Sequence, residues 1–248
     1  MKKLILGAFT LALAFTSCKE KPKEDDTSMT AEQTMETPSQ EGEWVTLFDG
    51  TNLDAFKAYN KDTLSSQWSI KGDALVFTPA EGRHGSENLI TKDEYHNFVI
   101  DFDWMISQGG NSGFMWAVKE DPKLGEPYLT GPEIQILDDK GHPDAKAGRT
   151  HQSGALYDMI AASEMANPAG EWNHYEITIN YDANQGVINM NGDDVVTFPL
   201  SGEGWTKLVE NSKFKNWSDF AKSDTGHLAF QDHGHEVSFK NIKIKELK

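Results

Sequence analysis

The sequence predicts an all-β protein organised as a β-sandwich or jelly roll, and three observations carry this prediction. Apolar and polar residues alternate with a period of two in several short stretches, which is the pattern of strands with one face in a core. Gly, Asn and Asp separate these stretches at short spacing, as tight turns do. Only residues 205–220 look helical or irregular. Many short strands joined by tight turns are typical of sandwiches and jelly rolls.

The first strands are expected between residues 68 and 118. Residues 68–70 and 74–77 are rich in apolar side chains and flank a Lys-Gly-Asp turn, which predicts a hairpin. Residues 98–106 carry Phe, Ile or Trp at every second position, so one side of this strand should face the core. Residues 113–118 are apolar almost throughout, which favours a strand that is central in its sheet.

The strand that begins at Glu133 is the most informative one. Successive side chains on a strand point to opposite faces. Ile134 and Ile136 should therefore face one side, and Glu133 and Gln135 the other, with Asp138 at the strand end. A carboxylate and an amide thus stand side by side on rigid backbone. Their face lies either in water or against a ligand, and this choice decides whether the protein is an enzyme.

Residues 172–181, 187–190 and 194–198 are expected to form a three-stranded meander. Asn191-Gly192, between the second and third of these strands, is the strongest turn signal in the chain.

The last two strands are expected at residues 226–231 and 236–247. Val237 and Phe239 fall on one parity of the second strand, whereas later apolar residues fall on the other. A strand can change parity and keep its core face only through a β-bulge, which we place near Lys240-Asn241.

The N-terminal residues read as export and anchoring signals. Residues 1–17, with Lys2, Lys3 and a short apolar run, are expected to be a signal peptide. Cys18, the only cysteine, is expected to carry a lipid, although an ordinary secreted protein is the alternative. Residues 18–42 are polar and suit a flexible, lipid-anchored linker. Residues 43–248 then form one domain in the cell envelope, in the periplasm or on the outer-membrane surface.

Charge excludes several classes of function. The chain has 23 basic and 39 acidic residues and a net charge of −16. This balance argues against nucleic acid and against anionic membrane as ligands, so membrane contact is expected through the lipid anchor alone. The sequence also lacks a Gly-rich phosphate loop, a CxxC pair and a Ser-centred nucleophile elbow. A small neutral substrate fits this composition best.

Side chains that suit sugar chemistry lie near the expected strands. Glu133, Gln135 and Asp138 resemble the Glu-x-Asp-x-x-Glu strand of some jelly-roll glycosidases, but the middle residue is Gln, which weakens the ordinary retaining mechanism. Asn111 follows two glycines and can bind hydroxyl groups. Tyr157 can stack on a sugar face, although aromatic residues of a sandwich are more often core.

Histidines add a second group of candidates. His233 and His235 lie in the turn between the last two strands. A histidine there can act as an acid or base near neutral pH, and the two are spaced to bind a divalent metal. His142 is a further candidate with weaker local support. Solvated turn histidines without a function are the alternative.

Seven motifs taken together are more specific than any of them alone. They cover nearly all of residues 43–248 and are, in order, LFDGTNL (47–53), GNSG (110–113), EIQILD (133–138), GALY (154–157), GEWN (170–173), QDHG (231–234) and FKNIKI (239–244). This set resembles the 3-keto-disaccharide hydrolase domain family. The resemblance implies a concanavalin A-like jelly roll. It also implies cleavage of glycosides whose C3 is oxidised to a ketone, in secreted or lipid-anchored bacterial proteins.

The chemistry that this resemblance implies is elimination. A ketone at C3 acidifies the hydrogen at C2, so a base can remove it and the group at C1 departs, with or without later addition of water. We expect Glu133 as the base, His233 as the proton donor or metal ligand, and Asp138 as the residue that orients a neighbour. The remaining site residues are expected to contact substrate, and they are Asn111, Gln135, Tyr157, Gln231, His142 and Trp116.

Cofactor, partner and competing functions stay open at this point. A divalent metal at His233 and His235 is compatible with the sequence but not required by it. A sugar 3-dehydrogenase is an expected upstream partner, since another enzyme must make the ketone. One alternative is a conventional glycoside hydrolase on the same fold, which would cleave unoxidised glycosides. The other is a carbohydrate-binding lipoprotein without catalysis.

Overall fold

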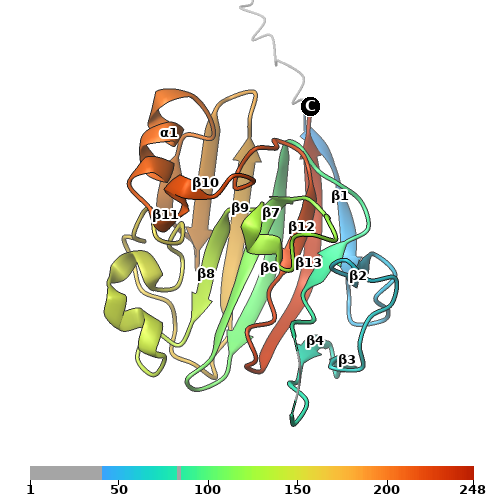
Figure 1. The fold of residues 1–248 in the computed structure, drawn as a ribbon. Coiled ribbons are helices and arrows are strands. Elements are labelled where there is room, and N and C mark those ends of the chain that lie inside the picture. Colours follow the sequence, from blue (N-terminus) through green and yellow to red (C-terminus); the bar gives the residue numbers. More distant parts are fainter. Residues whose placement is uncertain (1–40, 83–84) are drawn as a thin grey trace, which may run out of the picture. The chain divides into compact units, whose positions relative to one another are not determined.

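The computed structural model describes residues 41–82 and 85–248, which form two antiparallel β-sheets packed face to face (Figure 1). This is the predicted concanavalin A-like jelly-roll sandwich. The larger sheet has eight strands in the order β11-β10-β9-β6-β13-β4-β3, with β1 also paired to β13. Its members are β1 (Glu41–Phe48), β3 (Trp68–Lys71), β4 (Ala74–Phe77), β6 (Phe98–Ile106), β9 (Asn173–Asn180), β10 (Gln185–Met190), β11 (Asp193–Phe198) and β13 (Val237–Leu247).

The smaller sheet carries the polar strand and has the order β2-β5-β12-β7-β8. Its members are β2 (Phe56–Ala58), β5 (Leu89–Thr91), β7 (Asn111–Val118), β8 (Glu133–Leu137) and β12 (His227–Phe230). The described helices are short, and they are α1 (Gly202–Glu210) and the 3₁₀ turns η1 (Pro127–Leu129), η2 (Pro143–Ala147), η3 (Arg149–His151) and η4 (Lys213–Asn216). None of the helices within the described ranges has the length and apolarity needed to cross a bilayer.

Aromatic rings from both sheets fill the space between them. Phe102 on β6 lies 5.5 Å from Phe230 on β12, and Phe230 lies 4.9 Å from Phe239 on β13, measured between ring centroids. All three side chains are fully buried. Edge-to-face packing of this kind adds to the free energy gained from burying the rings. The core therefore joins the two sheets, and Phe102 lies on the inward face that the period-two pattern predicts for residues 98–106.

Most of the predicted strands are confirmed. The hairpin of β3 and β4, the strand of residues 98–106 and the meander of β9, β10 and β11 all form. β7 lies between β12 and β8, as expected of a strand that is apolar throughout. Asn191 and Gly192 both have positive φ, 56° and 99°, which is the requirement of the hairpin turn that Asn-Gly favours.

The predicted bulge of the last strand is also confirmed. The pairing of β13 with β6 shifts register between Lys240 and Lys243. Asn241 adopts a φ of 55° there, and its amide nitrogen donates to Asp103 at 2.7 Å. The shift lets Phe239 and Ile244 both reach the core although their sequence separation is odd.

Other boundaries differ from the expectation. The stretch expected at residues 205–220 contains η4 and most of α1, but α1 begins earlier, at Gly202. The pattern did not predict this start because the first turn of α1 lacks periodic apolar residues. β1 includes Glu41 and Gly42, the last two residues of the expected linker. The signal peptide, Cys18 and the rest of the linker lie outside the described residues and stay predictions.

We expect Phe239→Ala to lower the free energy of unfolding by about 3–5 kcal/mol, because it leaves a cavity among the rings that join the sheets. Glu176→Gln, on an exposed position of β9, should change it by less than about 0.5 kcal/mol. Urea unfolding followed by tryptophan fluorescence measures both. Equal midpoints for the two variants would contradict this account of the core.

Candidate active site

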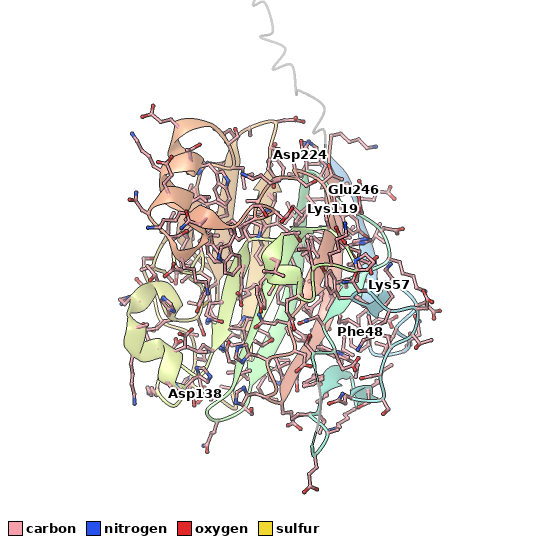
Figure 2. All side chains as sticks on the ribbon, viewed as in Figure 1. Phe48, Lys57, Lys119, Asp138, Asp224 and Glu246 are labelled. Atoms are coloured by element: carbon pink, nitrogen blue, oxygen red, sulfur yellow. The ribbon has the colours of Figure 1, made fainter. Side chains whose placement is uncertain are left out.

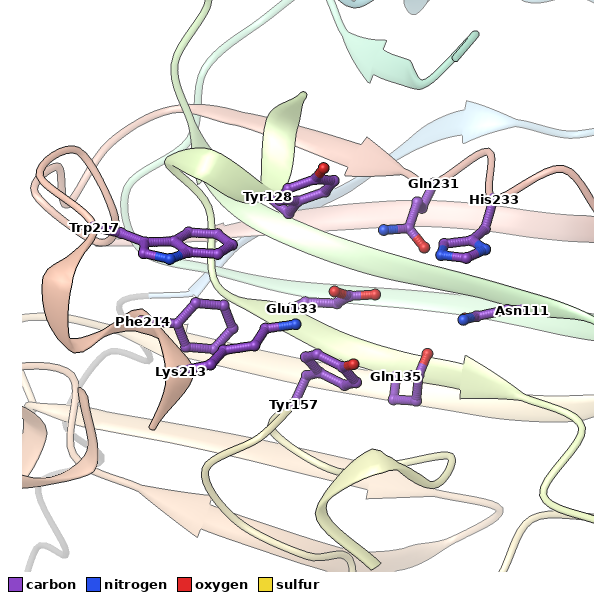
Figure 3. A pocket seen from close by; sticks show the side chains of 10 residues that line it. All are labelled: Asn111, Tyr128, Glu133, Gln135, Tyr157, Lys213, Phe214, Trp217, Gln231 and His233. Carbon is purple, nitrogen blue, oxygen red and sulfur yellow. The ribbon is translucent and has the colours of Figure 1, made fainter. Parts of the chain in front are cut away.

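A pocket of about 280 Å³ lies over the outer face of the smaller sheet, close to β8 (Figure 3). This volume is near the lower end of the range for small-molecule sites. β7 and β8 supply its floor, and η1, η4 and the loops after β8 and β12 supply its walls. The lining residues are Asn111, Tyr128, Glu133, Gln135, Tyr157, Lys213, Phe214, Trp217, Gln231 and His233.

The alternation predicted for β8 is confirmed, and it places Glu133 and Gln135 in this pocket. Ile134 and Ile136 are fully buried in the core, so Glu133 and Gln135 must face the other way. Gly113 lies beneath them on β7, and a Cβ at that position would overlap the Glu133 carboxylate. The absent side chain at Gly113 is thus what leaves room for Glu133 against the sheet.

Burial dominates the acidity of Glu133. The residue is 7 % exposed, and desolvation raises its pKa from the ordinary 4.5 to about 8. The positive charge of Lys213 opposes this shift, and the negative charge of Asp144 adds to it. At neutral pH Glu133 is therefore largely protonated. A rise of about one pH unit ionises half of it, and the resulting carboxylate is more basic than an ordinary one.

Two amide oxygens in the pocket lack a protein donor. Asn111 Oδ1 and Gln231 Oε1 are buried and accept no hydrogen bond from the described residues, and both side chains are 5 % exposed. A buried acceptor without a partner costs free energy unless a ligand or water supplies the donor. Gln135 differs, because its Oε1 accepts the backbone N–H of Ile136 at 2.9 Å, which leaves its amide nitrogen to donate. Together the three amides suit a ligand rich in hydroxyl groups.

Asp144 holds Tyr157, which is one of the lining residues, from outside the pocket lining. Its Oδ2 accepts the hydroxyl of Tyr157 at 2.9 Å, and its Oδ1 lies 3.1 Å from His151 Nδ1. Burial first, and then the bond to Asp144, raise the pKa of the Tyr157 hydroxyl well above its usual value. The Lys213 ammonium lies 4.1 Å from the centre of the Tyr157 ring. Tyr157 is therefore held neutral and in one orientation, with Lys213 across its face.

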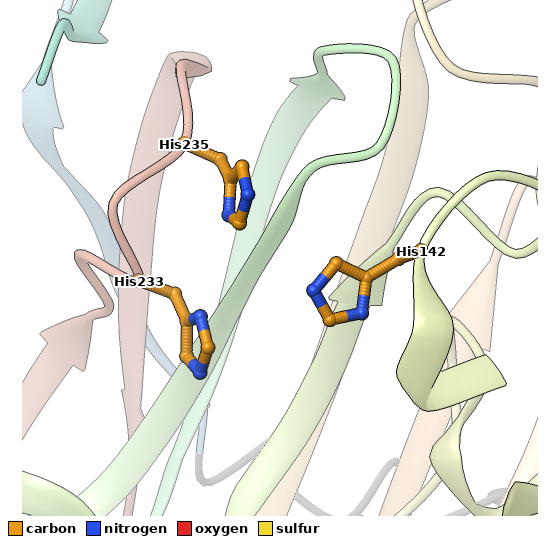
Figure 4. A group of neighbouring side chains, drawn as sticks. All are labelled: His142, His233 and His235. Atoms are coloured by element: carbon orange, nitrogen blue, oxygen red, sulfur yellow. The ribbon is translucent and has the colours of Figure 1, made fainter.

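The candidate histidines converge at the edge of the pocket. His233 lines the pocket, and His142 and His235 lie beside it, with one ring nitrogen of each within 4.8 Å of the others (Figure 4). His142 Nδ1 accepts the backbone N–H of Asp144 at 3.1 Å. Burial, and then the charge of His233, lower the pKa of His142. The neutral form of His142 is therefore favoured at pH 7. The structure brings His142 together with His233 and His235, the predicted acid–base and metal candidates, in one cluster.

Two predicted site residues lie elsewhere. Trp116, expected at the sugar, is 1 % exposed and packs in the core, where its indole N–H donates to the Tyr181 hydroxyl at 3.1 Å. Its assignment to substrate was wrong, because β7 points this residue inward. Asp138 lies at the end of β8, at the lower edge of Figure 2, and does not line the pocket.

The carboxylate of Asp138 instead holds two loops. It accepts the backbone N–H groups of Gly109 at 2.7 Å, Lys140 at 3.1 Å and Gly141 at 3.0 Å. Burial raises the pKa of Asp138, but these donors outweigh it and keep the pKa below its usual value. Asp138 therefore fixes the backbone of the loop that carries His142, and its predicted role in the reaction stays a prediction.

Sequence reasoning missed four lining residues. Lys213, Phe214 and Trp217 come from η4 and the residue just after it, and Tyr128 comes from η1. These turns show no strand or helix periodicity. The one available signal was the density of aromatic and basic residues within the polar stretch 205–220, which is unusual for a plain connecting loop.

Comparisons with known proteins identify similar sequences and structures. A family model described as the 3-keto-alpha-glucoside-1,2-lyase-like domain matches residues 43–245. A 3-keto-disaccharide hydrolase from Bacteroides thetaiotaomicron is 32% identical over 238 residues, which cover 86% of this chain and 81% of the relative. A crystal structure of a candidate glycosyl hydrolase from Parabacteroides distasonis superposes with a TM-score of 0.77 at 32% identity, over 83% of this chain and 94% of the other. A second from the same organism gives 0.63 at 28% identity, over 83% and 100%.

The raised pKa of Glu133 predicts how stability depends on pH. Because the folded pKa of Glu133 lies above its unfolded value, ionisation of this one group should lower the free energy of unfolding as pH rises from about 4.5 to 8, by roughly 1.4 kcal/mol for each pH unit. Glu133→Gln removes this loss. We therefore expect the melting temperature of Glu133→Gln minus that of wild type to be larger at pH 9 than at pH 4. The exposed control Glu176→Gln should differ from wild type equally at both pH values. The account fails if Glu133→Gln does the same.

Proposed function

The chain belongs to the 3-keto-alpha-glucoside-1,2-lyase-like domain family and is a glycoside-cleaving enzyme, and we propose that it cleaves 3-keto-glycosides by elimination, with Glu133 as the base. The observation that carries the proposal is the number of carboxyl groups that line the pocket. Among the ten lining residues, all in the described part of the chain, Glu133 has the only carboxyl group. Ordinary retaining and inverting glycosidases need two carboxyl groups flanking the bond. Elimination from a ketone needs one base.

Asp144 does not supply the missing second carboxylate. Both of its oxygens are already engaged, one by the Tyr157 hydroxyl at 2.9 Å and the other by His151 at 3.1 Å. It acts on Glu133 only through its charge, which adds to the raised pKa. This supports the keto-glycoside reaction over the two-carboxylate mechanism.

The proposed reaction begins with removal of a proton. The Glu133 carboxylate takes the proton from C2, and the C–H electrons become the C1=C2 double bond through an enolate at the C3 oxygen. The bond from C1 to the aglycone oxygen breaks, and its electrons leave with that oxygen, which takes up a proton. The lining offers His233 and the newly protonated Glu133 as donors of that proton. Addition of water across C1=C2 would complete a hydrolysis.

The pKa of Glu133 suits this task. A general base works best when its pKa is near the operating pH, because it is then both strong and partly ionised. Burial raises the pKa of Glu133 to about 8, which makes its carboxylate a stronger base than one of the ordinary pKa of 4.5. Lys213 keeps the ionised fraction from falling further, since its charge opposes the shift.

The remaining lining residues fit a sugar ring. Asn111 and Gln231 offer buried acceptors to hydroxyl donors, and the free amide nitrogen of Gln135 offers a donor. The ring centroids of Tyr128 and Trp217 lie 6.0 Å apart, and both rings line the pocket. Aromatic rings stack on the apolar faces of sugars. We assign these residues to substrate binding.

We further propose, from the sequence of residues 1–42 alone, that a lipid on Cys18 holds the domain at the cell envelope. The ketone at C3 has to be made by an oxidation of the glycoside. A sugar 3-dehydrogenase is therefore the class of enzyme that would act before this one.

Glu133→Gln should lower aglycone release from a 3-keto-glucoside by about 10²–10⁴-fold, because the amide cannot accept the C2 proton. Matched native and 3-keto glucosides, followed by release of the aglycone, make this measurement, with Glu176→Gln as the unaffected control. Release from the native glucoside would instead identify a conventional glycoside hydrolase. Saturable binding without cleavage of either glucoside would identify a binding protein.

The pH profile provides a second test. We expect kcat/KM for the 3-keto-glucoside to rise with pH up to about 8, as Glu133 ionises. Lys213→Met removes the charge that lowers this pKa, so the rising limb should move to higher pH. Lys215→Met, an exposed neighbour outside the lining, is the matched control and should leave the limb in place. A limb that is the same in all three proteins would contradict the assignment of Glu133.

A further inference from the structure

Three imidazole rings face one another beside the pocket. His142 precedes η2, and His233 and His235 lie on the loop between β12 and β13 (Figure 4). The ring centroids of His142 lie 6.1 Å from His233 and 5.5 Å from His235, and those of His233 and His235 are 6.1 Å apart. One nitrogen of each ring lies within 4.8 Å of the other two. Two loops that are far apart in the sequence thus bring the rings together.

We propose that His142, His233 and His235 bind one divalent first-row transition-metal ion, of which Zn²⁺ is the reference case. Imidazole nitrogen is a preferred ligand for such ions. Three imidazoles bound at about 2.1 Å in tetrahedral directions have ring centroids about 5 Å apart. The observed separations exceed this by about 1 Å or less, so small side-chain rotations close the site.

The backbone on both sides of the cluster is already held in place. The His142 N–H donates to the Asp138 carbonyl at 2.9 Å, and the Asp138 carboxylate caps the same loop. On the other loop, the Gly234 N–H donates to Asp232 Oδ1 at 2.8 Å, between the two histidines. His233 is exposed and the other two rings are half-buried, which leaves an entry path for an ion. A preformed backbone lowers the entropy lost on binding.

Binding requires one local change at His142. With Nδ1 accepting the Asp144 N–H at 3.1 Å, the neutral ring carries its proton on Nε2. An ion takes the place of that proton, which moves to Nδ1, and the bond to Asp144 N–H is given up.

The position of His233 links the ion to the pocket. His233 belongs both to the cluster and to the pocket lining. Three protein ligands leave one tetrahedral position open. On the premise of the proposed function, this position would take an oxygen of the keto-sugar and stabilise the enolate charge as a Lewis acid. His233 would then be a ligand, which leaves protonated Glu133 as the donor to the departing oxygen.

Metal binding can be tested without activity. The purified protein, free of any polyhistidine tag, is stripped with chelator and titrated with ZnCl₂ by calorimetry. Wild type should bind one equivalent, and its melting temperature should rise with Zn²⁺. His142→Ala and His235→Ala, both outside the pocket lining, should lose more affinity than the about 10–100-fold typical of outer-partner changes. His96→Ala, whose ring stacks on Tyr181 in a different cavity, is the matched control and should bind as wild type.

Each outcome separates the metal site from the proposed function. Equal Zn²⁺ binding by wild type and His235→Ala, with equal melting temperatures in chelator, would overturn the metal site, whatever the activity. One equivalent bound by wild type and lost in both variants supports the site. If such metal-loaded protein cleaves no 3-keto-glucoside, the proposed function fails and the site stands. If cleavage is the same with and without chelator, the Lewis-acid role fails and the site stands.

Discussion

The alternation of side chains along β8 is the constraint on which the rest of the site depends. Ile134 and Ile136 are buried between the sheets, so Glu133 and Gln135, which point to the opposite face of the strand, face the pocket. β8 is an edge strand, and its free edge is covered by the following loop: the Tyr157 N–H donates to the Glu133 carbonyl at 2.9 Å, and the Gln135 N–H to Ala155 at 3.1 Å. The hydrophobic core thus positions Glu133, the proposed base, and the edge of the same strand positions Tyr157 beside it.

The burial that raises the pKa of Glu133 also works against the stability of the folded domain. Glu133 gains basicity only because the fold withholds water from its carboxylate, and the ionised form is the one that the folded state disfavours. Gly113 contributes by leaving space for the carboxylate over the sheet. If Glu133 is the base that we propose, the reaction and the stability of the domain place opposite demands on the same carboxyl group.

The sequence predicted those parts of the structure that depend on local patterns. The alternation of Glu133 with Ile134, the Asn191-Gly192 turn and the bulge at Asn241 each follow from a few neighbouring residues, and each was confirmed. The sequence could not predict η4 or the place of Lys213 in the pocket, because this turn has no strand or helix periodicity and its position depends on packing against distant residues. It could not distinguish the core role of Trp116 from a sugar-binding role, and it could not show that His142 meets His233, since contacts between distant loops leave no local signal.

Asp144 has a consequence for how this family of sites can change over evolution. One carboxylate binds the Tyr157 hydroxyl and His151, while the backbone N–H of the same residue binds His142. A substitution of the Asp144 side chain would release Tyr157 and His151 but would leave the bond to His142 in place, because that bond uses the backbone. Positions 144, 151 and 157 are therefore coupled through one carboxylate, whereas position 142 depends only on the path of the chain.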